Sequence, residues 1–497
     1  MIDQYFLDQS ELVLTSDLAG EFPLYLYLSN DRSIFLYSKS IVDLLNDIRI
    51  NKPLKLSYEG LSFLLQSGVI PPPKTAYQNI YILGVGDRAK IYTKNGGIDL
   101  QFFHEFPFKT RDRSCIVDKE PDEDLILKLL AESTIKRIDE SKPSFLFHSA
   151  GKDSNTIALA LAEAGWQDKV TLITHKSKGN ADESSISAKI ARNLGFKHKI
   201  LFEVDQLTTD HYFSIENYFS HSPLPCTDSV TLAYSLYLNQ LPELNNSNII
   251  DGGGNDSYMI TPLKKNELNI FPLSKITSRL SFMRNFVISE SLLSPLLRTP
   301  AEWCGMSGLS YYDTKKIFPN AVNVFSHWDH ESKIRKDWDL FDFKTNILTS
   351  VTASEMHIRK VRNFTDSIAS NLILPFSNEN VAKCFLKMPE KYLFDRKKLK
   401  NKIILRKILS ERVDLDSDAL GKLGFTYDTR TVILKNWNFF YNEIFSCDLW
   451  EKDSLEKIIF RLRASMDKGG WVAKSSLSLI YRIYLISAWF NHNNYIK

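Results

Sequence analysis

From about residue 142 to residue 204 the chain alternates between short apolar runs and amphipathic stretches. SFLFHS precedes the alanine-rich TIALALAEAG, VTLITH precedes DESSISAKIARNLG, and HKILFEV ends the series. Strands that alternate with helices in this way pair in parallel, because each right-handed crossover returns the chain to the side of the sheet where it began. The alternation therefore predicts an α/β domain whose ligands bind at the carboxyl ends of the strands.

The first strand of this series ends in a turn of small and polar residues, after which the chain continues as a helix. The turn consists of Ser149, Ala150, Gly151, Lys152, Asp153 and Ser154. Its small residues let a phosphate approach the backbone, its serines offer hydroxyl donors, and the helix start offers unpaired N–H groups. Lys152 adds a positive charge, and Asp153 can hold Mg²⁺. The turn is a candidate nucleotide site, although S-x-G-x-D-S also occurs by chance at helix starts and the Walker A spacing is absent.

A later strand, SNIIDGGGND at residues 247–256, ends in three glycines and an aspartate. Gly252, Gly253 and Gly254 permit close backbone approach or positive φ, and Asp256 adds a carboxylate beyond the strand end. Two carboxylates from separate strand ends, Asp153 and Asp256, are suited to clamp Mg²⁺ on a triphosphate. The alternative is an ordinary glycine-rich turn.

The chain before residue 110 has a different pattern. Short β-rich runs such as PLYLYL, SIFLYS and AKIYTK are separated by Asn, Asp and Gly, which is typical of antiparallel strands. A charged segment then leads to the helical stretch LILKLLAESTIKRI. We therefore divide the chain into a sheet-containing domain at 1–110, a linker and helix at 111–141, and an α/β domain at 142–497 that is mostly helical beyond residue 260.

Composition narrows the classes of function. The chain has 497 residues, with 62 basic and 59 acidic side chains and a net charge of +3, which gives no reason to expect nucleic-acid binding. No apolar run approaches the roughly 20 residues that span a bilayer, so no membrane association is expected. The five cysteines are scattered and suggest neither disulfides nor a zinc site. A cytoplasmic location fits these features.

Two further positions have both a functional and an ordinary interpretation. The predicted helix at residues 400–413 is followed by the loop GKLGF, in which Lys422 lies among small residues. A solvated surface lysine is the usual outcome for such a position. His148 falls in a strand that looks buried, and the histidines form no triad pattern with Ser or Cys. We therefore retain Lys422, and not His148, as a candidate.

Together these segments resemble the asparagine-synthetase-like ATP-pyrophosphatases, the PP-loop enzymes that form amide bonds. Residues 149–154 are similar to the family's pyrophosphate loop S-G-G-x-D-S, with alanine replacing the first glycine. Further motifs of the family are matched in the same order by Asp182–Glu183, Gly252–Asp256, Leu374–Phe376, Lys402–Arg406 and Lys422–Phe425. The agreement extends over most of residues 10–430, and is far more specific than any one motif.

The resemblance implies that residues 1–110 are the remnant of an Ntn-type glutaminase domain. The segments around PLYLYL and VIPPPKTAYQ are similar to the second half of that domain, and the half that carries the nucleophile has no counterpart here. Such a glutaminase needs an N-terminal cysteine, whereas Ile2 follows Met1 and the nearest cysteine is Cys115. We therefore expect no glutamine hydrolysis, so that the amine comes from ammonia, from the substrate or from a partner.

The resemblance also implies the chemistry of the larger domain and its cofactors, ATP and Mg²⁺. The turn at 149–154 and the glycines at 252–254 would bind ATP, and Asp153 and Asp256 would hold Mg²⁺. A substrate carboxylate would attack the α-phosphorus and release pyrophosphate, and an amine would then attack the acyl-adenylate. Asp256 and Lys422 are the expected catalytic residues, with Lys422 stabilising the negative charge that develops.

Substrate contacts are expected from two segments. LPCTDS, at residues 224–229, is similar to the family's substrate-side loop, so Asp228 and Ser229 are candidates, with helix capping by Asp228 as an equal alternative. Ser257 is the third candidate. Glutamine-dependent asparagine-forming relatives have carboxylates at the positions of Gly253 and Ser257, and the loss of both makes aspartate a doubtful substrate.

β-Lactam synthetases and lasso-peptide cyclases share these departures, and both join a carboxylate to an amine on the same substrate. An intramolecular amine has a very high effective concentration and needs no ammonia supply. We therefore favour lactam or macrolactam formation on a peptide or small substrate, with a leader-peptide-processing protein as a conceivable partner. An ammonia-dependent asparagine-forming or other amidating enzyme and a non-catalytic ATP-binding homologue are the alternatives.

Overall fold

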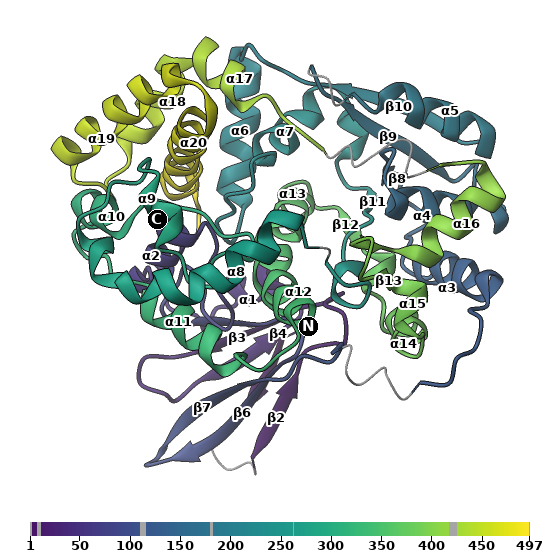
Figure 1. Ribbon diagram of the computed structural model, residues 1–497, viewed down its shortest axis with the longest axis horizontal. Coiled ribbons are helices and arrows are strands. Elements are labelled where there is room, and N and C mark those ends of the chain that lie inside the picture. Colours follow the sequence, from purple (N-terminus) through teal and green to yellow (C-terminus); the bar gives the residue numbers. More distant parts are fainter. Residues whose placement is uncertain are drawn as a thin grey trace.

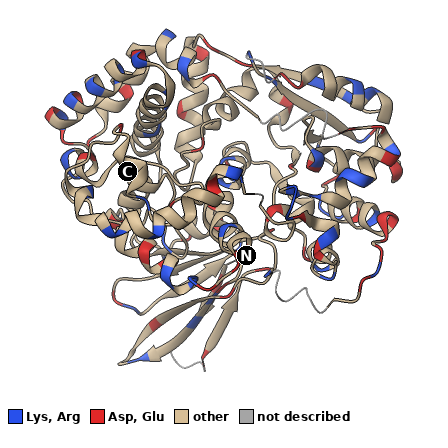
Figure 2. Ribbon diagram, in the orientation of Figure 1, with Lys and Arg blue, Asp and Glu red and all other residues tan. Residues whose placement is uncertain are grey.

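The computed structural model describes residues 2–6, 11–109, 116–178, 182–261, 263–416 and 425–496. It has a mixed α/β structure, with antiparallel sheets near the N-terminus, one five-stranded parallel sheet and many helices (Figure 1). The predicted α/β class is thereby confirmed. Lysine, arginine and acidic side chains are interspersed over most of these elements (Figure 2).

The parallel sheet contains the strands that the alternating sequence pattern predicts. Its order is β10-β9-β8-β11-β12, with β8 at Ser144–Phe147, β9 at Val170–Lys176, β10 at Lys197–Phe202, β11 at Asn248–Ile250 and β12 at Asn371–Ile373. All of its pairings are parallel. Because β8 pairs directly with β11, the turns that follow these two strands lie side by side. Strand β12 was not expected, since the chain beyond residue 260 was predicted to be mostly helical.

Successive residues of these strands face opposite sides of the sheet, as the pleat requires. Phe145 and Ile249 belong to one hydrophobic cluster, and Leu146 and Ile250 to another. The first cluster includes side chains of α6 (Thr209–His221), α7 (Thr231–Leu236), α13 (Arg359–Ser367) and α20 (Gly470–His492). The second includes those of α3 (Glu123–Ile135), α4 (Lys152–Glu163), α5 (Ser184–Leu194), α14 (Glu379–Leu386) and α16 (Ile403–Val413). Helices therefore cover both faces.

The N-terminal region contains the predicted antiparallel strands. One sheet has the order β1 (Ile2–Tyr5), β4 (Phe35–Ser38), β3 (Leu24–Leu28) and β5 (Ile80–Leu83), and a second has β2 (Leu12–Thr15), β6 (Asp87–Lys94) and β7 (Gly97–His104). Helices α1 (Ile41–Asn46) and α2 (Tyr58–Ser67) accompany them. Tyr25 and Leu36 share a core with Tyr484, so this region packs against the C-terminal helices. The domain boundaries themselves stay predictions.

The remaining helices surround this framework. They are α8 (Lys265–Thr277), α9 (Leu293–Leu296), α10 (Tyr311–Ile317), α11 (Phe325–Ile334), α12 (Leu340–Ile347), α15 (Glu390–Leu393), α17 (Thr429–Lys435), α18 (Trp437–Ser446) and α19 (Lys452–Ser465). A π-helix at Leu348–Ile358 joins α12 to α13, and the short strands β13 (Phe394–Asp395) and β14 (Lys400–Asn401) precede α16. Within the described ranges, no helix has the length and apolar character needed to cross a bilayer.

Candidate nucleotide site at the ends of β8 and β11

The turn between β8 and α4 is held in shape by its own side chains. The Ser149 N–H donates to Ser154 Oγ at 3.1 Å, and the Gly151 N–H donates to Ser149 Oγ at 3.0 Å. Asn155 Nδ2 donates to the carbonyls of Ser149 and Gly151, at 3.0 and 2.6 Å. Two hydroxyls and one amide therefore fix the loop before any ligand binds, which lowers the ordering cost of binding.

Helix α4 begins beside this loop without a capping side chain among the described residues; its N-cap is Gly151. The first N–H groups of a helix have no intrahelical acceptor, and the helix dipole places partial positive charge there. The start of α4 is therefore suited to an anionic group, as the sequence predicted. Ala150 is buried, and Lys152 does not belong to the described cavity lining at this loop.

Asp153 and Asp256 meet at one cation, the ammonium group of Lys402. Lys402 Nζ lies 2.6 Å from Asp153 Oδ2 and 3.2 Å from Asp256 Oδ1. Asn255 Nδ2 donates to the other oxygen of Asp153 at 2.6 Å, which orients that carboxylate. The two aspartates that the sequence assigned to one site are thus brought together, by a lysine at the N-cap of α16.

Lys402 is buried, with 8% of its surface exposed. Burial alone would lower the pKa of its ammonium group, but the charges and hydrogen bonds of Asp153 and Asp256 outweigh this and hold the pKa above its usual range. The side chain is therefore cationic throughout the physiological pH range. Lys402 appeared in the sequence only within a motif of the resembled family, without a role of its own.

The glycines after β11 allow this turn to approach the β8 loop. A Cβ on Gly252 would lie 3.1 Å from Asp153 Cβ and 3.2 Å from the Ser154 nitrogen. Gly254 has a φ of +110°, and a Cβ there would overlap Ser377 Oγ. At Gly253 an added Cβ would lie 3.0 Å from Asp251 Oδ1 and 3.5 Å from Ile358, and all of these nearest atoms belong to side chains. Close approach therefore requires glycine at 252, and both positive φ and lack of space require it at 254.

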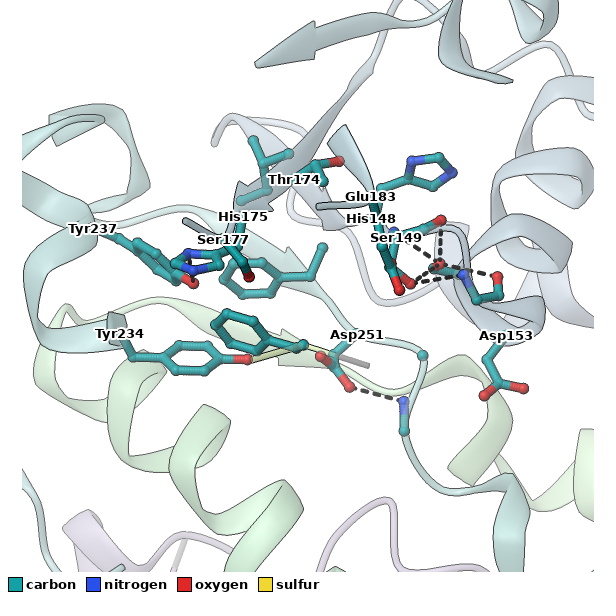
Figure 3. Close-up of a pocket in the computed structure, with 17 residues that line it drawn as sticks. His148, Ser149, Asp153, Thr174, His175, Ser177, Glu183, Tyr234, Tyr237 and Asp251 are labelled. Carbon is teal, nitrogen blue, oxygen red and sulfur yellow. Dashed lines mark hydrogen bonds between the residues drawn. The ribbon is translucent and has the colours of Figure 1, made fainter. Parts of the chain in front are cut away.

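A cavity of about 260 Å³ opens at these strand ends. The tyrosine rings of Tyr234 and Tyr237 lie on one side of it, and Ser149 and Asp153 on the other (Figure 3). Its described lining consists of Phe147, His148, Ser149, Gly151, Asp153, Ser154, Ile173, Thr174, His175, Ser177, Glu183, Tyr234, Tyr237, Asp251, Gly252, Gly253 and Phe425. The cavity joins an aromatic compartment to the polar loop.

His148 lines this cavity, contrary to its interpretation as an ordinary strand residue. It follows the last residue of β8, and its Nε2 lies 2.9 Å from Asn155 Oδ1. Because Asn155 uses its amino group as a donor, its Oδ1 accepts, and His148 carries its proton on Nε2. Burial lowers the pKa of His148 to about 4, so the ring is neutral at pH 7.

Two carboxylates border the loop, the buried Glu183 and the partly buried Asp251. Glu183 Oε2 accepts from the Ala150 N–H at 2.8 Å, and its other oxygen has no partner among the described residues. Asp251 Oδ1 accepts from the Gly253 N–H at 2.8 Å. Burial raises the pKa of both carboxyl groups, and the nearby charge of Asp153 adds to the rise at Asp251. The sequence analysis gave Asp251 no role, although it directly follows a strand of the parallel sheet.

The three candidate substrate residues, Asp228, Ser229 and Ser257, are not part of the described lining of the cavity. Asp228 is buried; its Oδ1 accepts from the Val230 N–H at 3.0 Å, and its Oδ2 lies 3.2 Å from Lys360 Nζ. Asp228 therefore makes a local turn contact just before α7. Ser229 is exposed. Ser257 is buried, and its hydroxyl donates to the Gly254 carbonyl at 3.2 Å.

Lys422, the expected catalytic lysine, lies outside the described residues, as do Leu423 and Gly424. The chain is described again from Phe425, whose ring packs against His175 with 4.5 Å between ring centroids. Phe425 also lies 5.8 Å from the Tyr234 ring. Phe425 therefore belongs to the wall of the cavity.

The donor set can be compared with the needs of Mg²⁺. No group of three or more His, Cys, Asp or Glu side chains suited to a metal occurs in the described part of the chain. Mg²⁺ bound with a nucleotide needs only one or two carboxylates, because phosphate oxygens and water complete its octahedron. Asp153 and Asp256 already converge on one cation, so they fit a metal of this kind.

The chain has no match among protein-family models, and no curated protein matches it. The case for a function therefore rests on the residues and the geometry described above.

Proposed function

We propose that this protein is an ATP-dependent amide synthetase that activates a substrate carboxylate as its adenylate and joins it to an amine. The single observation that carries the proposal is the convergence of Asp153, Asp256 and Lys402 beside the loop at 149–154. Two carboxylates and a buried cation next to a helix start are what a metal-bound triphosphate requires. In this proposal the parallel-sheet domain is a PP-loop synthetase, and the N-terminal sheets are the glutaminase remnant.

ATP would extend along the cavity. Its base and ribose would lie in the compartment of Tyr234, Tyr237 and Phe425, and its phosphates at the start of α4. Asp153 and Asp256 would hold Mg²⁺, which neutralises charge on the phosphates when it is bound. Lys402 supplies a second, permanent positive charge beside them.

In the proposed reaction the substrate carboxylate is first activated by ATP and is then joined to the amine. A carboxylate oxygen attacks the α-phosphorus, the bond from that phosphorus to its bridging oxygen breaks, and pyrophosphate leaves. Lys402 and the N–H groups at the start of α4 stabilise the charge of the leaving pyrophosphate. The amine nitrogen then attacks the acyl carbon, loses a proton, and expels AMP. Lys422 is expected to stabilise the negative charge of that step.

The substrate class is inferred from two positions, Gly253 and Ser257, at which the sequence has no carboxylate. Both favour a substrate that carries its own amine, and hence a lactam or macrolactam product, as in lasso-peptide cyclisation. Ammonia-dependent amidation and ATP binding without catalysis are the other outcomes that the experiment below distinguishes.

The proposal is tested in two stages. First, ATP binding is measured by calorimetry with Mg²⁺ and with EDTA, for the wild type, Asp153→Asn, Asp256→Asn and the exposed control Asp168→Asn. We expect Mg²⁺-dependent binding that both site variants weaken about tenfold or more and the control leaves unchanged. Binding that is equal in all four proteins would overturn the nucleotide site.

Second, pyrophosphate release is measured with linear peptides that carry a free amino terminus and a side-chain carboxylate, with hydroxylamine present to trap the acyl-adenylate as a hydroxamate. Substrate-dependent pyrophosphate and hydroxamate support the proposed synthetase. Stimulation by aspartate with ammonium, but by no peptide, would indicate the ammonia-dependent alternative. Normal ATP binding without release for any substrate would indicate a non-catalytic protein.

A further inference from the structure

Helix α8 leaves most of its apolar side chains uncovered. Of its residues only Phe271 and Ser274 are buried, whereas Leu268, Leu273 and Ile276 are 38%, 47% and 64% exposed. A surface helix is normally stabilised by burying its apolar stripe. Large exposed side chains continue into the next segment, at Leu280, Phe282 and Phe286. An apolar patch of this extent marks an interaction site.

Beside this helix lies a groove of about 900 Å³, whose described lining shares no residue with that of the nucleotide site. One wall is formed by α8 and the turn after it, and the other by α11, the following loop and α12. Its apolar lining is Phe271, Pro272, Ile276, Pro300, Phe325, Trp338, Leu340 and Phe343. The volume is at the upper end of the range for ligand pockets, roughly 300–1,000 Å³, so it can take several side chains at once.

The charged lining of the groove is almost entirely basic. Five cations contribute to it, namely Lys275, Arg279, Lys333, Arg335 and Lys336, against one acid, Asp329. Asp329 is paired with Lys333 at 2.6 Å, and Arg335 is paired with Glu331 at 2.6 Å. Lys275, Arg279 and Lys336 form no ion pair with any residue that the structure describes. The groove thus has unneutralised positive charge on both walls.

The arrangement of these groups matches an extended ligand with repeated anionic groups. On α8, Pro272 and Ile276 are four residues apart and form an apolar row. Lys275 lies on the same helix, and Arg279 follows in the 3-10 helix Ser278–Asn285. Lys336 adds a cation from the opposite wall. A single small anion would engage one of these positions, whereas a polypeptide with alternating acidic and apolar side chains engages all of them. A concave groove between helices also favours a chain segment over a flat lipid surface.

We propose that this groove binds an acidic, amphipathic segment of a partner polypeptide. Its apolar side chains would lie between Phe271, Phe325 and Trp338, and its carboxylates would pair with Lys275, Arg279 and Lys336. Two contacts join α8 to α12: Lys344 pairs with Glu267 at 2.7 Å, and the Phe271 and Phe343 rings pack with 5.7 Å between centroids. Docking needs no ATP and does not depend on the proposed reaction.

A consequence that does rest on the proposed function concerns substrate delivery. Helix α12, which lines the groove, continues through the π-helix to Ile358, the residue 3.5 Å from a Cβ placed on Gly253. A polypeptide bound in the groove would therefore contact α12, and the π-helix that continues α12 reaches the nucleotide site at its other end. The groove is suited to the recognition segment of a peptide substrate or of the protein that presents it.

The probe is a fluorescein-labelled helical peptide with glutamates on one face and leucines on the other, titrated by anisotropy without ATP. We expect saturable binding that weakens with salt, and a loss of affinity of about tenfold or more in the double variant Lys275→Glu/Arg279→Glu. The matched control Lys457→Glu, on α19, should bind as the wild type does. A peptide with lysines in place of the glutamates should bind the double variant better than the wild type.

Three results would overturn the proposal. The first is equal peptide affinity in the double variant and the Lys457→Glu control. The second is no peptide binding by the wild type, with the circular dichroism of a folded protein. The third is that only vesicles of phosphatidylglycerol and phosphatidylcholine bind, and do so through the same two cations, which would make the patch a membrane surface. Unchanged peptide binding by Lys402→Met would separate this site from the nucleotide site.

Discussion

Lys402 and Asp153, which are 249 residues apart in the sequence, are joined by a 2.6 Å contact between Nζ and Oδ2. The same ammonium group reaches Asp256, so removing it takes away the positive charge that the two carboxylates share. We expect Lys402→Met to raise the Kd for ATP with Mg²⁺ about tenfold. We also expect it to lower the free energy of unfolding by about 1–3 kcal/mol.

Calorimetry and urea unfolding measure these two effects. Lys407→Met is the matched control, because Lys407 lies on the same helix but is 42% exposed at the surface. Equal behaviour of the two variants would mean that Lys402 has no special role. The side chain of Asp256 is 43% exposed, so water stabilises part of its charge. We therefore expect a smaller loss in the free energy of unfolding than a fully buried, uncompensated charge would cause.

His148 gives the stability of the protein a specific dependence on pH. Burial lowers its pKa in the folded protein to about 4, below the 6.5 that is usual for histidine, so protonation favours the unfolded chain. The stability that the neutral ring permits is therefore complete above pH 6.5 and is lost as the pH falls towards 4. At about pH 5 this residue should cost about 2 kcal/mol relative to neutral pH.

His148→Gln removes the titrating group but keeps a donor for Asn155 Oδ1. The free energy of unfolding of this variant should fall less between about pH 7 and pH 5 than that of the wild type, by about 2 kcal/mol. Urea unfolding at a series of pH values measures the difference. Parallel curves for the two proteins would show that His148 is not the group responsible.

The sequence predicted the parts of the site that depend on local pattern. The loop at 149–154 and the glycines at 252–254 each directly follow a strand, and a strand end beside a helix start is recognisable within a dozen residues. It is harder to predict that β8 and β11 are neighbours in the sheet, because no single segment of the sequence determines the strand order. Strand β12 was missed because its three residues show no periodicity.

Lys402 and His148 show what the sequence could not supply. The position of Lys402 depends on how α16 packs against α4, a contact between segments far apart in the chain. His148 is in the site because β8 ends one residue before it, and the boundaries of elements are the least predictable feature of a sequence. Asp251 could have been predicted, because ligands of a parallel sheet bind at the carboxyl ends of the strands and polar residues there face the ligand.

Gly254 should tolerate no side chain. Its φ of +110° is unfavourable for other residues, and an added Cβ would overlap Ser377 Oγ. We expect Gly254→Ala to lower the free energy of unfolding by about 2–4 kcal/mol. Gly165 provides the control, since it has a φ of +74° with nothing within 4 Å of an added Cβ, so Gly165→Ala reports backbone strain alone.

A second variant separates the two costs at this position. Ser377 Oγ has no hydrogen-bond partner among the described residues, so Ser377→Gly should cost little by itself. In Gly254→Ala/Ser377→Gly the overlap with the serine side chain is relieved, so the double variant should be more stable than Gly254→Ala. A double variant no more stable than Gly254→Ala would show that the close approach to Ser377 is unimportant.

Glu183 places a negative charge beside the loop where the phosphates of ATP are proposed to bind. Its Oε2 accepts from the Ala150 N–H, and burial raises the pKa of its carboxyl group. Removing the charge should favour an anionic ligand, so Glu183→Gln should lower the Kd for ATP about fivefold, which corresponds to about 1 kcal/mol.

The amide oxygen of glutamine can still accept from Ala150, so the loop should keep its shape. Asp182→Asn, at the neighbouring and partly exposed position, controls for a general change of charge near α5. Calorimetry at low and moderate salt measures both, and weaker ATP binding by Glu183→Gln would instead show that the carboxylate holds the loop in its binding conformation.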